Sequence, residues 1–261
     1  MHWKVFIIVK MNKLIIVILL CCQIVLFSCT NTPWHKEQAE MFLNKGISLI
    51  EAGQFNNALK ELLDAEKYSS GDAKIHYYMG MAYHGKGLRD KAMDEFKEAI
   101  SLKSNYSDAH NYLGTLYMDI EQWDKAIEEF DKALANDIYD TPSFALYNSG
   151  WAYYNKKNYQ QALMQYQQAL QKDSRTILRP QIEKNIGLIY LAQSNLLDAI
   201  RQFKTAVELS PSLYDAQLFL GESYLKINDK NNAQKAFQAV VKYSPQSAYG
   251  KKAKEYLQSI R

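Results

Sequence analysis

The sequence predicts an all-α protein, a right-handed superhelical solenoid of six repeated helix pairs closed by a C-terminal capping helix. Three observations support this fold class. Glycine recurs every 34 to 37 residues, small and aromatic residues follow each glycine at constant distances, and apolar residues recur between them at helical spacing. With 261 residues, of which 48% are hydrophobic and 23% charged, the chain is long enough to bury a sizeable core.

The repeat is visible at three positions. Each glycine is followed twelve residues later by an alanine, and the alanine is followed four residues later by Leu, Phe or Tyr. The glycines are Gly46, Gly80, Gly114, Gly150, Gly187 and Gly221, the alanines are Ala58, Ala92, Ala126, Ala162, Ala199 and Ala233, and the large residues are Leu62, Phe96, Phe130, Tyr166, Phe203 and Phe237. Six coincident matches indicate six copies of one structural unit.

Each unit is predicted to be a pair of amphipathic helices. In the third repeat, Ala126, Ile127 and Phe130 share one helical face, while Lys125 and Glu128 lie on the other. The small residues let the two helices of a repeat approach closely, and we expect the aromatic ring to fill the gap toward the next repeat. One pair cannot bury its apolar face alone, so the repeats must stack, which produces a concave groove.

The period also sets the domain boundaries. The predicted repeats span residues 39–72, 73–106, 107–140, 143–176, 180–213 and 214–247, and the capping helix spans residues 248–261. In the cap, Ala253, Tyr256 and Leu257 are expected to face the sixth repeat. Extra residues near 137–141 and 176–179 lengthen the connections on both sides of repeat four, and we expect a local change of superhelical pitch there.

The first 28 residues have the pattern of a targeting segment. Lys13 precedes an apolar run over residues 14–27. The run ends in Ser28 and Cys29, which resembles a bacterial lipobox, where a small residue precedes a cysteine that is acylated and becomes the mature N-terminus. This resemblance implies a signal peptide over residues 1–28 and lipidation of Cys29.

Residues 29–38 would then form the acylated N-terminus and a spacer. Met1 and Met11 both remain possible starts, and Met11 fits the signal better. Thr30 follows the cysteine, and by resemblance to sorted lipoproteins this implies the outer membrane. The alternative is an uncleaved inner-membrane anchor, although fourteen apolar residues fall short of the ~20 that span a bilayer.

Charge and cysteine content exclude several functions of the body. Without residues 1–28, the chain has 28 basic and 28 acidic residues and is formally neutral. Binding to a phosphate backbone needs a concentrated positive field, so nucleic acid is not an expected partner. All three cysteines precede residue 30, so the body has no thiol for a disulfide, a metal or nucleophilic catalysis.

The chain also has no recognisable catalytic motif. G-x-S-x-G, Walker A and H-E-x-x-H patterns do not occur. His76 and His110 occupy the fourth position of consecutive repeats, but two imidazoles without a third ligand at suitable spacing make a weak metal site. We expect them to pack between helices instead. The sequence therefore predicts no enzyme, no metal, no cofactor and no small-molecule substrate.

The repeated pattern resembles the tetratricopeptide repeat (TPR) over about residues 39–247. In that family the second, fifth, ninth, twelfth and thirteenth residues of a repeat usually face the ligand. Transferring this rule gives a partner-binding groove of Tyr77, Met81, His84, Asn111, Thr115, Phe144, Tyr147, Trp151, Tyr154 and Leu188.

The aromatic residues of repeat four stand out in this groove. They are spaced three, four and three apart, so they share one helical face, which we expect not to be the face that contacts the second helix of the repeat. Rigid Tyr and Trp rings are efficient anchors for a peptide segment, and Trp151 and Tyr147 are the favoured contacts. The alternative is that the rings fill space around the longer connections.

Residues 136–142, followed by Ala145, Asn148 and Gly150, resemble the corresponding stretch of the type IV pilus biogenesis and stability lipoproteins. The order of lipobox, spacer, six repeats and cap matches that family as well. The resemblance implies a lipid-anchored protein at the periplasmic face of the bacterial outer membrane. Its implied role is pilotin-like: it binds the secretin, the channel through which pili emerge, and assists its assembly or localisation.

A second function of a different class fits the same features. A general periplasmic TPR adaptor would recruit a peptidoglycan hydrolase or a protease to the outer membrane. Loss of heat-resistant secretin multimers on deletion of the protein would discriminate the two functions.

Overall fold

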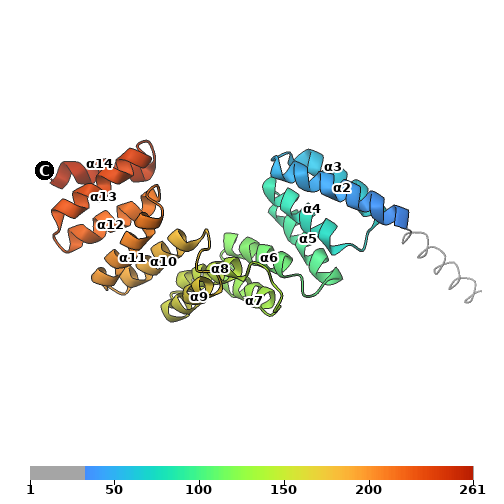
Figure 1. The fold of residues 1–261 in the computed structure, drawn as a ribbon, viewed down its shortest axis with the longest axis horizontal. Coiled ribbons are helices and arrows are strands. Elements are labelled where there is room, and N and C mark those ends of the chain that lie inside the picture. The colour runs from blue at the N-terminus through green and yellow to red at the C-terminus, as the bar shows by residue number, and fades with distance from the viewer. Residues whose placement is uncertain (1–32, 261) are drawn as a thin grey trace, which may run out of the picture. The chain divides into compact units, whose positions relative to one another are not determined.

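The computed structural model describes residues 33–260, which form thirteen α-helices and no β-strand (Figure 1). The helices are α2 (Pro33–Glu51), α3 (Phe55–Tyr68), α4 (Ala73–Gly85), α5 (Arg89–Leu102), α6 (Ser107–Asp119), α7 (Trp123–Leu134), α8 (Pro142–Asn155), α9 (Tyr159–Lys172), α10 (Arg179–Ala192), α11 (Leu196–Leu209), α12 (Tyr214–Lys226), α13 (Lys230–Tyr243) and α14 (Ala248–Ile260). The predicted signal peptide, the two possible starts and Cys29 lie outside the described residues.

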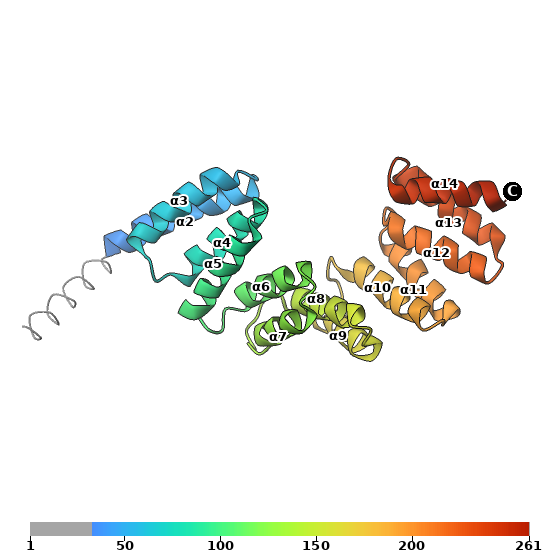
Figure 2. The ribbon, with the colours of Figure 1, turned by 180° about the vertical axis from the view of Figure 1, so that it is seen from behind.

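Consecutive helices form six pairs followed by one further helix, so the predicted all-α solenoid with a capping helix is confirmed. The chain divides into two compact units, one ending at Ala109 and one beginning at His110. The first unit contains α2 to α5 and the second contains α7 to α14; Figure 2 labels these helices. The first helix begins at Pro33, so residues 33–38, which we assigned to the spacer, are helical.

The two helices of each pair are joined by a turn that contains one residue with a left-handed backbone. These residues are Gly53, Gly87, Glu121, Lys157, Ser194 and Asn228, with φ between 58° and 73°. Glycine adopts this conformation without steric cost, whereas most other side chains are strained in it. Asn228 tolerates this conformation as well, so the strained residues are Glu121, Lys157 and Ser194. Strain at the same position in three repeats indicates that helix packing, not local preference, dictates the turn.

Inside each pair, the repeated glycine lies against the repeated large side chain. A Cβ added at Gly150 would lie 2.7 Å from Cε1 of Tyr166, and the equivalent glycines show the same close approach to Leu62, Phe96, Phe130, Phe203 and Phe237. The ring therefore packs on the glycine of its own repeat, and it also reaches the next one, as we expected: Tyr166 accepts a hydrogen bond from Asn185 of α10, and Phe203 stacks on Phe219 of α12. The six repeated alanines are fully buried, as close helix packing requires.

The last helix covers the end of the second unit. Ala253 of α14 is fully buried, and the Tyr256 ring stacks on Phe237 with centroids 4.7 Å apart. The Tyr256 hydroxyl donates to Glu222 of α12 at 3.0 Å, and Lys252 forms an ion pair with the same carboxylate at 2.6 Å. α14 thus closes the apolar face of repeat six, as a cap must.

Candidate partner-binding groove

Four aromatic residues lie on α8, the first helix of repeat four. Phe144 is 39% exposed, and Tyr147, Trp151 and Tyr154 are half-buried. The Trp151 and Tyr154 rings stack with centroids 5.1 Å apart and planes 13° apart. We call these four residues the aromatic face. The stack fixes the indole in one orientation, which lowers the entropy lost when a partner covers it.

Two tyrosines of the aromatic face also contact the second helix of the repeat. The Tyr147 ring lies 6.0 Å from that of Tyr166, and the Tyr154 ring lies 5.8 Å from that of Tyr159. This corrects the expectation that the face is separate from the α9 contact. Burial raises the pKa of the Tyr154 hydroxyl, so the group stays neutral over the physiological pH range. Tyr147 and Tyr154 therefore pack against α9, and the Trp151 ring stacks on Tyr154.

The polar groove residues of repeat three lie beside repeat four. The Asn148 side-chain amide donates to Oδ1 of Asn111 at 3.1 Å, which joins α8 to α6. The Thr115 hydroxyl donates to the Asn111 carbonyl oxygen at 3.0 Å, so its proton is used within its own helix. Asn111 and Thr115 are half-buried, and the hydrogen bond places Asn111 beside α8.

Repeat five contributes fewer exposed groups. Leu188 is half-buried and packs against the apolar cluster that includes Ile200 and Phe203. Lys184 of α10 forms an ion pair with Asp215 of α12 at 2.9 Å, and both side chains are largely buried. This pair, which the sequence did not reveal, holds repeats five and six together and neutralises the charge beside Leu188.

The remaining predicted groove residues lie on α4, in the first unit. Tyr77 is only 9% exposed, and its ring lies 5.1 Å from Tyr106 and 5.9 Å from Phe96. It is a core residue and offers little surface to a partner, which corrects its assignment to the groove. Met81 is half-buried and His84 is exposed, so these two remain accessible on the unit.

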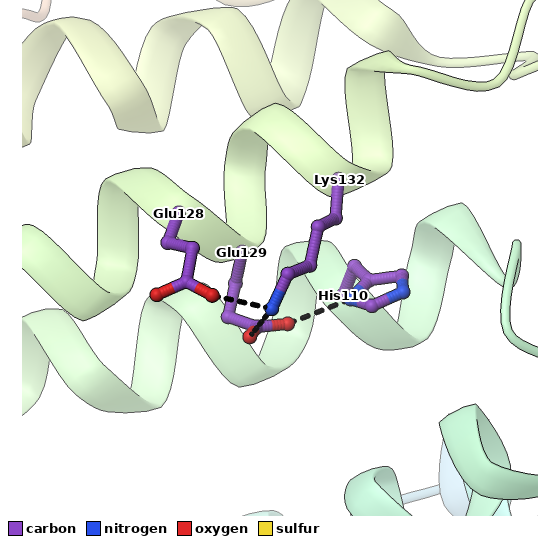
Figure 3. A network of polar contacts seen from close by, with 4 residues as sticks. All are labelled: His110, Glu128, Glu129 and Lys132. Carbon is purple, nitrogen blue, oxygen red and sulfur yellow. Dashed lines mark hydrogen bonds and ion pairs between the residues drawn. The ribbon is translucent and has the colours of Figure 1, made fainter.

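The two histidines at the fourth repeat position each face a glutamate on the second helix of the same repeat. His76 Nδ1 lies 2.9 Å from Glu95 Oε2, and His110 Nδ1 lies 2.6 Å from Glu129 Oε2. Figure 3 shows the second pair with Lys132, whose ammonium lies 2.9 Å from the other Glu129 oxygen and 2.7 Å from Glu128. We call His76–Glu95 and His110–Glu129 the histidine–glutamate pairs.

These pairs confirm that the histidines pack between helices, and they add a hydrogen bond that we did not predict. Burial alone would raise the pKa of the Glu129 carboxyl, but hydrogen bonds from His110 and Lys132 hold it below its usual value. The hydrogen bond to Glu95 raises the pKa of His76. The signal was present in the sequence, because each glutamate follows its histidine by nineteen residues.

Within residues 33–260, no cluster of three or more His, Cys, Asp or Glu side chains is arranged to hold a metal ion. In the same part of the chain, no helix is both long enough and apolar enough to cross a membrane. The candidate site itself consists of aromatic and amide side chains, which are suited to contact with a polypeptide.

Stacked helix pairs with an aromatic surface define a repeat scaffold for protein–protein interaction. Tetratricopeptide-repeat models match residues 43–109, 105–174 and 190–255. Together they cover more than half of the chain, which therefore belongs to the tetratricopeptide-repeat family. No sequence among the curated proteins matches it.

Solved structures of TPR proteins share the fold. PilF of Pseudomonas aeruginosa matches with a TM-score of 0.74 at 14% identity, over 85% of this chain and 98% of that chain. PilW, a widely conserved type IV pilus biogenesis factor, matches with a TM-score of 0.73 at 20% identity, over 82% and 97%. YrrB, a TPR protein with an unusual peptide-binding site, matches with a TM-score of 0.57 at 19% identity, over 74% and 97%.

Proposed function

We propose that this chain is an outer-membrane lipoprotein that binds a protein partner through the aromatic face and assists the assembly or localisation of the type IV pilus secretin. The observation that carries the binding role is the Trp151–Tyr154 stack on the half-exposed surface of α8. The pilus role draws on the likeness to PilF and PilW, which extends over nearly the whole length of both.

The partner segment is expected to be apolar and internal to its chain. The aromatic face supplies a large rigid apolar surface, and the neighbouring Asn111 and Asn148 amides can hydrogen-bond to a peptide backbone. Basic residues that could clamp a terminal carboxylate are missing from the fifth and ninth positions of repeats two to four. Binding then requires no bond to be made or broken, which agrees with a scaffold function.

Membrane attachment is assigned to Cys29. A single acyl chain gives only marginal attachment, whereas the several chains of a bacterial lipoprotein anchor it stably. The intact mass of protein extracted from membranes tests this assignment. The lipoprotein proposal requires loss of residues 1–28 and an added lipid mass, and an unmodified Met1 or Met11 terminus would contradict it.

The secretin role is tested by deleting the protein and measuring heat-resistant secretin multimers in outer-membrane fractions. The proposal expects the multimers to disappear and to return with the wild-type chain. Complementation with Cys29→Ser separates anchoring from binding, because this variant keeps the aromatic face. Unchanged multimers in the deletion strain would refute the secretin role and leave the adaptor function.

A further inference from the structure

The two lengthened connections on either side of repeat four each expose an isoleucine. Ile138, between α7 and α8, is 82% exposed, and Ile177, between α9 and α10, is 81% exposed. Neither side chain contributes appreciably to the core, so folding alone does not account for an isoleucine at either position. A single exposed aliphatic side chain is ordinary on a protein surface, so the two isoleucines gain meaning only from what lies beside them.

Both connections lie at the same edge of the second unit. The helices of a pair run antiparallel, so every connection from the second helix of one repeat to the first helix of the next is at one end of the stack. The turns between the two helices of one repeat, such as the turn from α10 to α11, lie at the opposite end of the helices. Ile138 and Ile177 are therefore neighbours along one edge, one repeat apart.

A cavity of about 460 Å³ opens at this edge, beside the first connection. Its apolar wall is Leu134, Pro142 and Leu146, with Tyr139 from the connection itself. The rim is polar and consists of Asn136, Asp137, Gln168, Gln171 and Lys172. The last of these residues ends α9, from which the second connection leaves. The cavity is large enough to admit an aliphatic side chain, and its wall is suited to one.

The charges beside the two isoleucines are opposite in sign. The exposed Asp137 and Asp140 flank Ile138, whereas the exposed Arg175 lies two residues before Ile177. Asp173 accepts a hydrogen bond from the backbone N–H of Arg175 at 3.0 Å, which shapes the second connection. The first connection thus carries two exposed carboxylates beside a cavity, and the second carries an exposed aliphatic anchor with Arg175 close to it in sequence.

We propose that this edge binds a second copy of the same chain. Ile177 of each copy enters the cavity of the other, and Arg175 of each copy faces Asp137 of the other. Because anchor and cavity lie on one edge, a two-fold axis fills both cavities at once and leaves neither open for further growth. A membrane surface does not fit, because anionic headgroups would meet Asp137 and Asp140.

The test is the self-association of the full chain in detergent, measured by sedimentation velocity over a range of protein concentrations. Ile177→Asp is expected to raise the dimer dissociation constant at least tenfold. Leu197→Asp is the matched control, because Leu197 is 73% exposed at the start of α11, at the other end of the helices. It is expected to leave the dissociation constant unchanged, and circular dichroism checks that both variants fold.

Charge reversal tests the pairing itself. Asp137→Arg and Arg175→Asp should each weaken the dimer at least tenfold, and the combined variant should return to within about threefold of the parent, because it restores opposite charges across the two-fold axis. A parent chain that remains monomeric at every concentration would overturn the proposal, as would a combined variant that remains monomeric.

Lipid binding is the outcome that would identify another occupant of the edge. Binding of the monomeric parent chain to phosphatidylethanolamine–phosphatidylglycerol vesicles that is lost in Ile177→Asp would assign the edge to lipid and overturn the proposal. The body has no cysteine, so an Ile177→Cys, Gln171→Cys variant gives a direct readout. The proposal expects an intermolecular disulfide under mild oxidation, and a cross-link no stronger than that of Leu197→Cys, Gln171→Cys would contradict it.

Discussion

Repeats two and three differ from repeat four at positions that are otherwise equivalent. Repeats two and three join their helices through the histidine–glutamate pairs, whereas repeat four has Leu146 and Gln165 at the same two positions. The Gln165 Oε1 and the Ser149 hydroxyl are buried there without a hydrogen-bond partner, among the residues that the structure describes. Repeat four therefore lacks the polar link and instead presents aromatic side chains.

The difference shows which parts of a repeat carry the fold. The contact between glycine and ring and the buried alanine are the same in all three repeats, and so is the left-handed turn. These shared contacts fix the helix pair, so the link between the fourth and twenty-third positions can vary. Repeat four, with its longer connections and its aromatic face, is where the scaffold departs from a regular stack.

The largest expected effect is the loss of stability when the polar link of repeat three is removed, compared with the same change in repeat four. Glu129→Leu should destabilise the protein by about 3 kcal/mol, because it removes the buried carboxylate to which His110 Nδ1 and Lys132 are bonded. The equivalent Gln165→Leu should change stability by less than about 0.5 kcal/mol or increase it, because it removes an unsatisfied buried oxygen. Denaturant titrations of the two variants measure the contrast. Equal losses would show that the link is not what distinguishes the repeats.

The repeats could be predicted from the sequence because each is specified by local spacing that recurs six times. The glycine at position 114 and the ring at position 130 show where the helices touch without knowledge of the rest of the fold. The histidine–glutamate pairs were missed because recognising them requires knowing which faces of two helices meet. The spacing of nineteen becomes meaningful only with that geometry.

The groove was predicted less well, for a physical reason that Tyr77 illustrates. Its repeat position suggests exposure, but Tyr106, from the irregular connection after α5, covers it. Irregular segments follow no period, so their packing cannot be inferred from the repeat. The early start of α2 has a similar cause, because Trp34 packs edge-on against Tyr68, with ring centroids 5.6 Å apart.

An overpacking test should affect both kinds of repeat equally. Ala126→Leu and Ala162→Leu each add volume at a fully buried alanine that faces the other helix of its pair. Each is expected to cost about 2 kcal/mol of unfolding free energy. Thermal or denaturant unfolding measures both. A large loss of stability in one repeat with none in the other would mean that the two helix pairs are not packed equally closely at this alanine.

The stability that the His76–Glu95 pair contributes should depend on pH, whereas the uncharged Gln165 of repeat four should contribute none that does. Because the folded pKa of His76 is raised by Glu95, the pair adds stability that is fully present below about pH 6.5, the ordinary histidine pKa, and is lost as pH rises through the raised value. The unfolding free energy lost in Glu95→Gln should therefore be larger at pH 6 than at pH 9. The change caused by Gln165→Leu should be the same at both pH values.

The smallest expected effect is at the turn between the two helices of a repeat. This turn has a left-handed residue at the same position in repeats three and four. Glu121 and Lys157 have φ of 58° and 60°. Replacing either with glycine removes steric strain and should stabilise the protein by roughly 1 kcal/mol, less the greater chain entropy of unfolded glycine. Melting temperatures of Glu121→Gly and Lys157→Gly provide the measurement. Destabilisation of either variant would show that the side chain makes contacts that outweigh the strain.

The central claim is that Trp151 in the aromatic face anchors the partner, and one comparison tests it most directly. The full chain and its Trp151→Ala variant are titrated with the purified secretin, and their unfolding is followed by circular dichroism. Trp34→Ala is the control, because Trp34 is 55% exposed in the other unit. The account predicts that Trp151→Ala weakens binding by about 2 kcal/mol or more, roughly thirtyfold, while its stability changes by less than about 1 kcal/mol. Unchanged binding, or a folding loss of several kcal/mol that marks Trp151 as a core residue, would contradict it.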